Sequence, residues 1–138
     1  IRSAACFGAE RLYVIGHIPK RSRLKATSGS LVDYVEMVQF SNPDEFLTHA
    51  QVQGIQVVSA ELVEYARPLS DYTFDFNRRL CVVVGNEESG VPPEILKRSD
   101  VVYIPMPGIG YCLNTAQAAN IILYAAVEQY EKGLVSDI

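Results

Sequence analysis

The chain has 138 residues, of which 49% are hydrophobic and 20% charged, and these values fit one globular domain with a single core. The formal net charge of −4 excludes a surface that binds polyanions everywhere, because nucleic-acid affinity comes mostly from Lys and Arg. The longest apolar run, residues 118–127, is far shorter than the ~20 residues that span a bilayer. Any nucleic-acid contact is therefore expected to be a local basic patch.

Apolar periodicity and turn residues predict an alternation of short helices and strands. In chain order we expect a helix over 1–7, strands over 12–15 and 34–40, a helix over 43–53, strands over 55–59 and 80–84, a helix over 92–97, a strand over 101–104 and a helix over 115–132. Residues 80–84 form a continuous apolar run that is typical of a strand buried on both faces. This order indicates an α/β fold with a mostly parallel sheet flanked by helices.

Two connections have no regular pattern. Residues 61–77 form a polar connection of uncertain structure. Residues 16–30 contain proline, glycine and several serines, and they predict a long mobile loop. This loop carries the candidate nucleic-acid patch, which consists of Lys20, Arg21, Arg23 and Lys25. A solvated loop without a ligand is the alternative.

The cysteines and histidines indicate neither a disulfide framework nor a metal site. Cys6, Cys81 and Cys112 lie far apart and form no Cys-x-x-Cys pair. His17 and His49 stand alone, without a second ligand at metal-binding spacing. Together with the absence of a signal peptide, these features lead us to expect a cytoplasmic protein without a metal.

The predicted C-terminal helix is apolar or small at almost every position from 116 to 127, apart from Gln117 and Asn120. A helix that covers one face of a monomer should instead show a polar stripe. We therefore expect a homodimer built on this helix, in which Ile122 or Leu123 faces the partner.

Two loops that follow apolar strands are the expected site of function. Gly85–Gly90 follows residues 80–84, and Pro105–Asn114 follows residues 101–104. If these strands are neighbours in a parallel sheet, the loops face a common crevice, where ligands bind in α/β proteins. The first loop could be a bare turn in which both glycines permit positive φ. The prolines and glycines of the second loop fix an open backbone suited to a flat polar ligand such as a purine.

The two loops carry long motifs. They read Val84-Gly85-Asn86-Glu87-Glu88-Ser89-Gly90-Val91-Pro92 and Ile104-Pro105-Met106-Pro107-Gly108-Ile109-Gly110-Tyr111-Cys112-Leu113-Asn114. These stretches resemble the second and third motifs of the SpoU (TrmH) branch of the SPOUT RNA methyltransferases, and residues 1–10 resemble the tail of the first motif. The resemblance covers the whole chain as one SPOUT-like domain, 1–138, which is expected to lack its first strand.

The resemblance implies a C-terminal trefoil knot, an S-adenosylmethionine site formed by the knotted loops, and an obligate homodimer. The implied activity is methylation of a ribose 2′-hydroxyl in tRNA or rRNA, with the basic patch binding the RNA. The implied catalytic residues are Arg2, Glu87 and Asn114. The implied cofactor-binding residues are Val84, Gly85, Asn86, Ile104, Pro105, Met106, Gly108, Ile109, Cys112 and Leu113.

Several roles stay open at this stage. Arg2 could act beside the target hydroxyl or hold the adjacent phosphate, because arginine stays protonated in proteins. Asn114 could merely cap the last helix. The family usually has serine where Cys112 stands and a second small hydroxyl residue where Ala116 stands. These departures suggest the alternative of a non-catalytic RNA-binding module that retains the knotted dimer.

Overall fold

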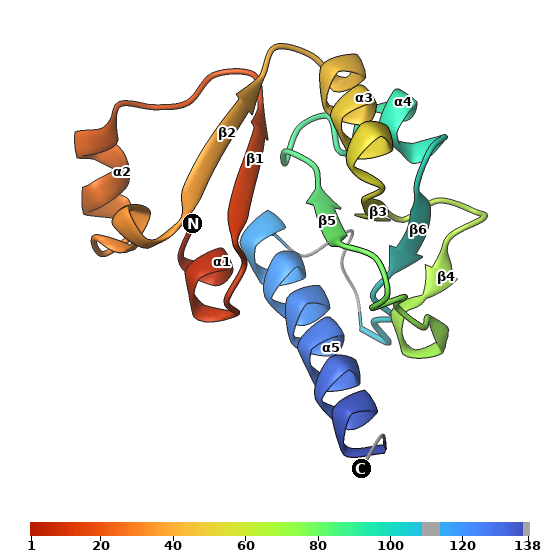
Figure 1. The fold of residues 1–138 in the computed structure, drawn as a ribbon. Coiled ribbons are helices and arrows are strands. Elements are labelled where there is room, and N and C mark those ends of the chain that lie inside the picture. The colour runs from red at the N-terminus through yellow and green to blue at the C-terminus, as the bar shows by residue number, and fades with distance from the viewer. Residues whose placement is uncertain (109–113, 137–138) are drawn as a thin grey trace. The chain divides into compact units, whose positions relative to one another are not determined.

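The computed structural model of the chain describes residues 1–108 and 114–136. The chain forms two units, Ile1–Phe46 and Leu47–Ile138, whose helices and strands are labelled in Figure 1.

The first unit is built around two parallel strands. Its elements are α1 (Arg2–Cys6), β1 (Arg11–Ile15), α2 (Arg21–Thr27), the 3-10 turn η1 (Leu31–Tyr34) and β2 (Glu36–Phe40). The strands pair in register from Arg11 with Glu36 to Ile15 with Phe40. The rings of Tyr13, Phe40 and Phe46 form a cluster with centroid separations of 5.5 to 5.8 Å. This cluster anchors the strands at their carboxyl ends.

The expectation of a mobile loop over residues 16–30 is wrong, because residues 21–27 form the helix α2. Arg, Lys, Leu and Ala dominate this segment, and all four are good helix formers. Tertiary contacts stabilise the short helix. The buried Ser28 follows α2, and its Oγ accepts a hydrogen bond from the Val32 N–H at 3.2 Å. The side chain of Arg21 also pairs with Asp33 of η1.

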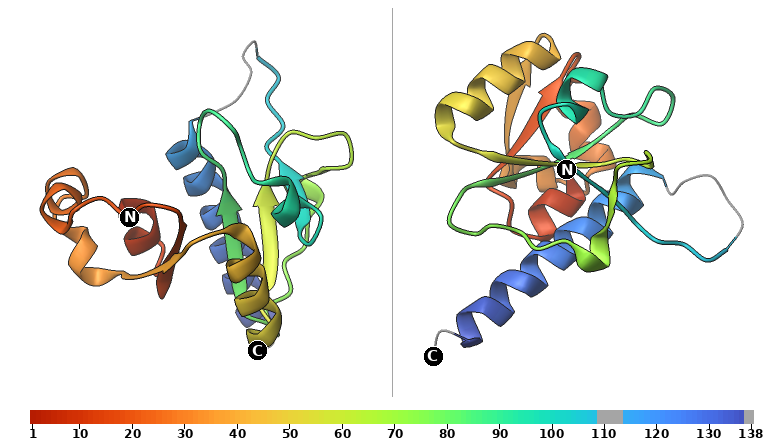
Figure 2. Two further views of the ribbon diagram at one scale, coloured as in Figure 1. Left: turned by 90° about the horizontal axis from the view of Figure 1, so that it is seen from above. Right: turned by 90° about the vertical axis from the view of Figure 1, so that its right-hand side faces the viewer.

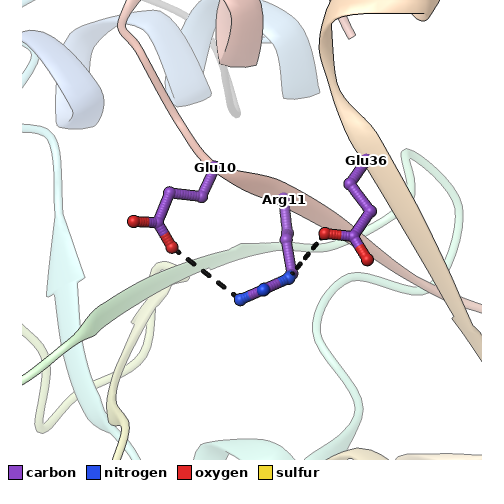
Figure 3. A network of polar contacts seen from close by, with 3 residues as sticks. All are labelled: Glu10, Arg11 and Glu36. Atoms are coloured by element: carbon purple, nitrogen blue, oxygen red, sulfur yellow. Dashed lines mark hydrogen bonds and ion pairs between the residues drawn. The ribbon is translucent and has the colours of Figure 1, made fainter.

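Arg11 forms a polar network on the paired strands. Its Nε donates to Glu36 Oε2 at 2.8 Å across the two strands, and its Nη1 lies 3.8 Å from Glu10 Oε2 (Figure 3). The hydrogen bond to Glu36 and the charge of this carboxylate raise the pKa of Arg11. Arg11 is thus occupied in strand pairing and adds little to the basic patch that follows it in sequence.

The second unit contains a four-stranded parallel sheet in the order β4-β6-β3-β5. The helix α3 (Pro43–Gln53) leads into it and begins as expected, with Asn42 Oδ1 accepting the Glu45 N–H at 3.0 Å. The elements that follow are β3 (Gln56–Ala60), β4 (Arg67–Pro68), the 3-10 turn η2 (Leu69–Asp71), β5 (Leu80–Val84), α4 (Pro93–Leu96), β6 (Asp100–Tyr103) and α5 (Thr115–Ser136). The α/β class with parallel strands and flanking helices is confirmed.

Strand order corrects two expectations about β5. We expected β5 and β6 to be neighbours, but β3 lies between them and pairs with both. We also expected β5 to be the strand buried on both faces. Instead β5 is half-buried along its whole length, whereas Val57, Val58 and Ser59 of β3 are buried. A central strand has neighbours on both sides, and β5 is an edge strand of the described sheet.

The long helix α5 packs along β5, as the views in Figures 1 and 2 agree. Ile122 is 0% exposed and lies with Ala126 in the same hydrophobic core as Val58 and Val102. Of the two residues expected to face a partner, Ile122 is thus buried in the core of the single chain, whereas Leu123 is half-buried. On α5, Ile121 and Tyr124 are instead exposed at 39% and 60%.

A polar network holds α5 against the amino-terminal edge of this sheet. The Tyr72 hydroxyl donates to Asp100 Oδ2 at 2.7 Å and accepts from Gln56 Nε2 at 3.1 Å. Gln129 of α5 donates to the Tyr72 carbonyl at 2.8 Å and accepts from the Phe74 N–H at 3.0 Å. Burial, followed by the hydrogen bond to Asp100, raises the pKa of Tyr72 to about 12. The opposite, carboxyl-terminal edge of the sheet is left for ligands.

In the ranges 1–108 and 114–136, no helix is long and apolar enough to cross a membrane. The expected trefoil knot depends on the path of residues 105–114. Because residues 109–113 lie outside the described part of the chain, the knot remains an expectation.

Candidate active site

A cleft of about 770 Å³ opens at the carboxyl edge of the sheet in the second unit. Its walls come from the segments that follow β3, β5 and β6 and from the start of α5. The lining residues are 60–63, 84–91, 96, 102–104, 106, 114 and 115. Ligand pockets in proteins commonly have volumes of roughly 300–1,000 Å³, and in open α/β sheets they lie at this edge. The cleft is therefore the candidate site.

The loop after β5 is a turn that Asn86 closes from within. Asn86 Oδ1 accepts hydrogen bonds from the Glu88 N–H at 2.9 Å, the Ser89 N–H at 2.7 Å and the Ser89 hydroxyl at 2.9 Å. The Gly90 N–H also donates to the Asn86 carbonyl at 3.0 Å. Because the side-chain oxygen of Asn86 is used inside the turn, its backbone is the part that is left for a ligand.

The two glycines of this turn are required for different reasons. Gly90 has a φ of +72°, in the left-handed region that favours glycine. Gly85 is not among the glycines with a positive φ. A Cβ added to Gly85 would instead lie 2.1 Å from the carbonyl carbon of Gly90 and 2.3 Å from the Val91 nitrogen. Gly85 is thus needed because two backbone segments touch.

Among the described residues, three carboxylates line the cleft, and no Lys or Arg does. Glu87 and Glu88 are exposed at the tip of the turn, and Glu61 follows β3. The cleft therefore favours a ligand that carries positive charge, because like charges disfavour an anion. Glu87, the expected catalytic acid, lies in this lining.

The segment after β6 contributes Ile104 and Met106 to the lining, so these two join Val84, Gly85 and Asn86 of the expected cofactor set. Pro105 and Gly108 are exposed and are not among the lining residues. A Cβ added to Gly108 would meet no described atom within 4 Å. Ile109, Cys112 and Leu113 lie outside the described residues.

Asn114 lines the cleft and also caps α5. Its Oδ1 accepts the Gln117 N–H at 3.0 Å, and its carbonyl accepts the Ala118 N–H at 3.0 Å. The capping interpretation of Asn114 is therefore confirmed. Because Oδ1 is engaged, the amide nitrogen Nδ2 is the group that Asn114 would offer to a substrate.

The remaining expected site residues belong to the first unit. Arg2 is the first residue of α1 and is exposed. The four cations of the basic patch, Lys20, Arg21, Arg23 and Lys25, are all exposed on or beside α2. Residues 11–32 contain no Asp or Glu, and Asp33, which directly follows them, pairs with Arg21.

Glu61 and Thr115 are among the cleft residues that were not expected from the sequence. Glu61 lies at the carboxyl end of β3, a position that the edge rule would have identified if β3 had been placed between β5 and β6. Thr115 was expected only as the start of a helix, yet its Oγ1 donates to the Gly85 carbonyl at 2.8 Å. No local pattern in the sequence predicts this contact.

Fold and site together define an α/β protein with a candidate ligand cleft at the carboxyl edge of a parallel sheet. The chain belongs to the SpoU rRNA Methylase family, whose sequence profile matches residues 1–124. Among its relatives is the tRNA (guanosine(18)-2'-O)-methyltransferase of Aquifex aeolicus, which is 32% identical over 99% of this chain and 65% of that protein. Another is the 23S rRNA (guanosine-2'-O-)-methyltransferase RlmB of Acinetobacter baylyi, which is 32% identical over 94% of this chain and 53% of that protein.

Solved structures share the fold. The A. aeolicus TrmH/SpoU tRNA modifying enzyme superimposes with a TM-score of 0.82 at 30% identity, over 98% of this chain and 69% of that one. The SpoU methyltransferase AviRb from Streptomyces viridochromogenes, solved in complex with the cofactor AdoMet, gives 0.77 at 31% identity, over 94% of this chain and 51% of that one. The chain spans 65% and 53% of the two curated relatives named above.

Proposed function

We propose that the chain is an S-adenosylmethionine-dependent methyltransferase that modifies a ribose 2′-hydroxyl of tRNA or rRNA. The observation that carries the proposal is the carboxyl-edge cleft, which is lined by Glu87 and Asn114 in a chain of the SpoU family. Both relatives named above are 2'-O-methyltransferases, one of tRNA and one of 23S rRNA.

The cleft suits the cofactor. S-adenosylmethionine supplies a methyl group on a positively charged sulfonium, and the lining residues that the structure describes include Glu61, Glu87 and Glu88 but no Lys or Arg. The volume of about 770 Å³ is ample for a nucleoside-sized ligand. We propose that the backbone of residues 84–86, 104–106 and 108–109 reads the adenine, with Cys112 and Leu113 completing the cofactor set.

Methyl transfer to a ribose oxygen requires alignment of the hydroxyl with the methyl group and removal of a proton from that hydroxyl. Asn114 Nδ2 is a neutral donor at the start of α5 that can orient the ribose. Glu87 places a carboxylate at the mouth of the same cleft. The role of Arg2 is assigned from its motif alone: a fork of N–H donors that holds the target phosphate or hydroxyl.

The RNA would bind to α2 through Lys20, Arg21, Arg23 and Lys25. Of these, Arg21 is paired with Asp33, so it also fixes η1 against α2. Tyr34, the last residue of η1, is 79% exposed. A basic segment beside an exposed aromatic ring is the combination that binds single-stranded RNA, because phosphates pair with the cations and a base can stack on the ring.

We also propose a homodimer built on α5. Ile121 and Tyr124 leave an exposed apolar stripe on this helix, three residues apart and so on one face. A single domain over residues 1–138 and a cytoplasmic location remain part of the same proposal, the latter because Cys6 and Cys81 are free thiols.

Calorimetry with S-adenosylmethionine tests the cofactor assignment. The wild-type chain should bind, and Gly108→Phe should lose binding, because Gly108 belongs to the motif segment that we propose reads the adenine. Its thermal unfolding should not change, because a Cβ at Gly108 would meet no described atom within 4 Å. Gly133→Phe is the matched control, since Gly133 lies in α5, outside both motif segments, and its Cβ would also meet nothing within 4 Å. RNA binding without cofactor binding would instead support the non-catalytic RNA-binding module.

A further inference from the structure

We propose that Glu61 is a positioning residue that fastens the Gly85–Gly90 turn to the sheet and thereby fixes the wall of the cofactor cleft. Glu61 follows β3, the strand between β5 and β6. It therefore stands at the point of the sheet edge that is flanked by both motif-bearing segments. The inference rests on the proposed function for its meaning, but its geometry does not depend on the cofactor.

Both oxygens of the Glu61 carboxylate accept backbone hydrogen bonds. Oε2 accepts the Val91 N–H at 2.9 Å, just beyond the turn, and Oε1 accepts the N–H of its neighbour Leu62 at 3.3 Å. The Glu61 N–H itself donates to the Val102 carbonyl of β6 at 3.1 Å. Glu61 is thus anchored in the sheet through its backbone and holds the turn through its side chain.

The other hydrogen bonds of the turn do not replace this link. The bonds of Asn86 Oδ1 end on Glu88 and Ser89, and the bond from the Gly90 N–H ends on the Asn86 carbonyl, so all of them stay inside the turn itself. At the amino-terminal end, Gly85 is held by the adjoining β5 and by Thr115. At the carboxyl-terminal end, the described hydrogen bond from Val91 ends on Glu61. Loss of the carboxylate should therefore release the end of the turn that follows Glu87.

The side chain of Glu61 lies against Gly90, where it leaves no room for a Cβ. A Cβ added to Gly90 would lie 2.5 Å from Glu61 Oε2, closer than real Cβ atoms approach oxygen. The φ of +72° at Gly90 disfavours a side chain as well. The carboxylate therefore occupies the space that a side chain at position 90 would need, so these two residues specify the turn together.

The substitution Glu61→Gln distinguishes a positioning role of Glu61 from a role of its negative charge. Glu61→Gln retains a side-chain carbonyl that can accept the Val91 N–H, whereas Glu61→Ala removes the acceptor. If Glu61 positions the turn, Glu61→Ala should lower the affinity for S-adenosylmethionine and for its product S-adenosylhomocysteine, which lacks the sulfonium charge, by the same factor. We expect a factor of about tenfold or more, since hydrogen bonds to charged groups contribute this much. Gln should restore most of the affinity for both. Glu64→Ala, an exposed glutamate of the same connection outside the cleft lining, is the matched control.

Calorimetry with both ligands gives a clear decision. Normal binding by Glu61→Ala would overturn the proposal. The proposal would also be overturned if Glu61→Gln bound both ligands as weakly as Glu61→Ala, or if it lost affinity only for the cationic S-adenosylmethionine. In either case the charge of Glu61, and not its hydrogen bond to Val91, would be what matters. If the wild-type chain bound neither ligand, the proposed function would fail, and the decision on Glu61 would pass to a ligand-free measurement.

That measurement is a double-mutant cycle on chemical unfolding. Gly90→Ala should destabilise the wild type through both φ strain and the collision with Oε2, but should cost less in Glu61→Ala, where the collision is gone. Gly54→Ala is the matched control. Gly54 has a φ of +65° and a Cβ there would meet nothing within 4 Å, so its cost should be the same in both backgrounds. Additive costs for Gly90→Ala and Glu61→Ala would contradict the proposed contact.

Discussion

The hydroxyl of Thr115 donates to the carbonyl of Gly85 at 2.8 Å and so joins the first residue of α5 to the residue that follows β5. Both residues line the cleft. The start of the helix and the start of the Gly85–Gly90 turn are therefore held in one arrangement.

Replacing Thr115 with valine should loosen this arrangement. Valine keeps the shape of the side chain but removes the donor, which should cost about 1 kcal/mol of unfolding free energy and leave the Gly85 carbonyl without this partner. Affinity for S-adenosylmethionine should fall as well. Thr115→Ser keeps the hydroxyl and is the control. Chemical unfolding and calorimetry that show no difference between the valine and serine variants would mean that the bond has no role.

Two substitutions of Asn114 should distinguish its role in folding from its role in methyl transfer. Asn114→Asp keeps an oxygen that can cap α5 but loses the amide donor, so it should fold normally, bind S-adenosylmethionine and lose single-turnover methyl transfer. Asn114→Ala should in addition lose about 1 kcal/mol of stability with the cap.

Arg2 and Cys112 should differ in their effect on the reaction. Arg2→Ala should lose methyl transfer with near-normal cofactor affinity, whereas Cys112→Ala should lower the rate of transfer only slightly. An inactive Cys112→Ala beside a fully active Arg2→Ala would show that the family roles do not apply.

The α2 cations should set the salt dependence of RNA binding. Arg23→Glu combined with Lys25→Glu should weaken binding to RNA of any sequence and lower the slope of log affinity against log salt by about 1 per lost phosphate contact. Lys97→Glu combined with Arg98→Glu changes the net charge by the same amount outside α2 and should have less effect. Filter binding at several salt concentrations measures the slope. Equal effects of the two double variants would mean that only overall charge matters.

The faces of α5 should give opposite outcomes. Ile121→Lys and Tyr124→Lys should produce folded monomers, because both residues are exposed in the single chain. Ile122→Lys should instead unfold the protein, since it buries an unpaired charge in the core at a cost of several kcal/mol. Light scattering and circular dichroism distinguish these results. A wild-type monomer at micromolar concentration would refute the dimer.

Local chemistry explains which parts of the fold could be predicted. The limits of α3 follow from Asn42 and the proline beside it at the start of the helix and from Gly54 at its end. Each of these signals lies within one or two residues of the limit that it sets. β5 is found at its predicted limits because five apolar residues occur in a row. Both signals act over a short stretch of chain, and the same holds for the cap at Asn114.

The predictions failed mainly where contacts between different segments of the chain determine the structure. The position of β3 between β5 and β6 is a matter of pairing across the chain, and without it Glu61 is one polar residue among many. α2 has seven residues, too few for a clear helical periodicity in the sequence, and it is joined to η1 by the Arg21–Asp33 pair. Gly85 was explained by φ, although a close approach to Gly90 requires it.

The central claim, methyl transfer to a ribose oxygen, is tested most directly by following the methyl group. The full chain is incubated with S-adenosylmethionine that carries an isotopically labelled methyl group and with unmodified tRNA or rRNA, and the RNA is then digested to nucleosides for mass spectrometry. The account predicts the label in a 2′-O-methylnucleoside, and its loss in Asn114→Asp. Label on a base, or RNA without label although the cofactor binds, would contradict it.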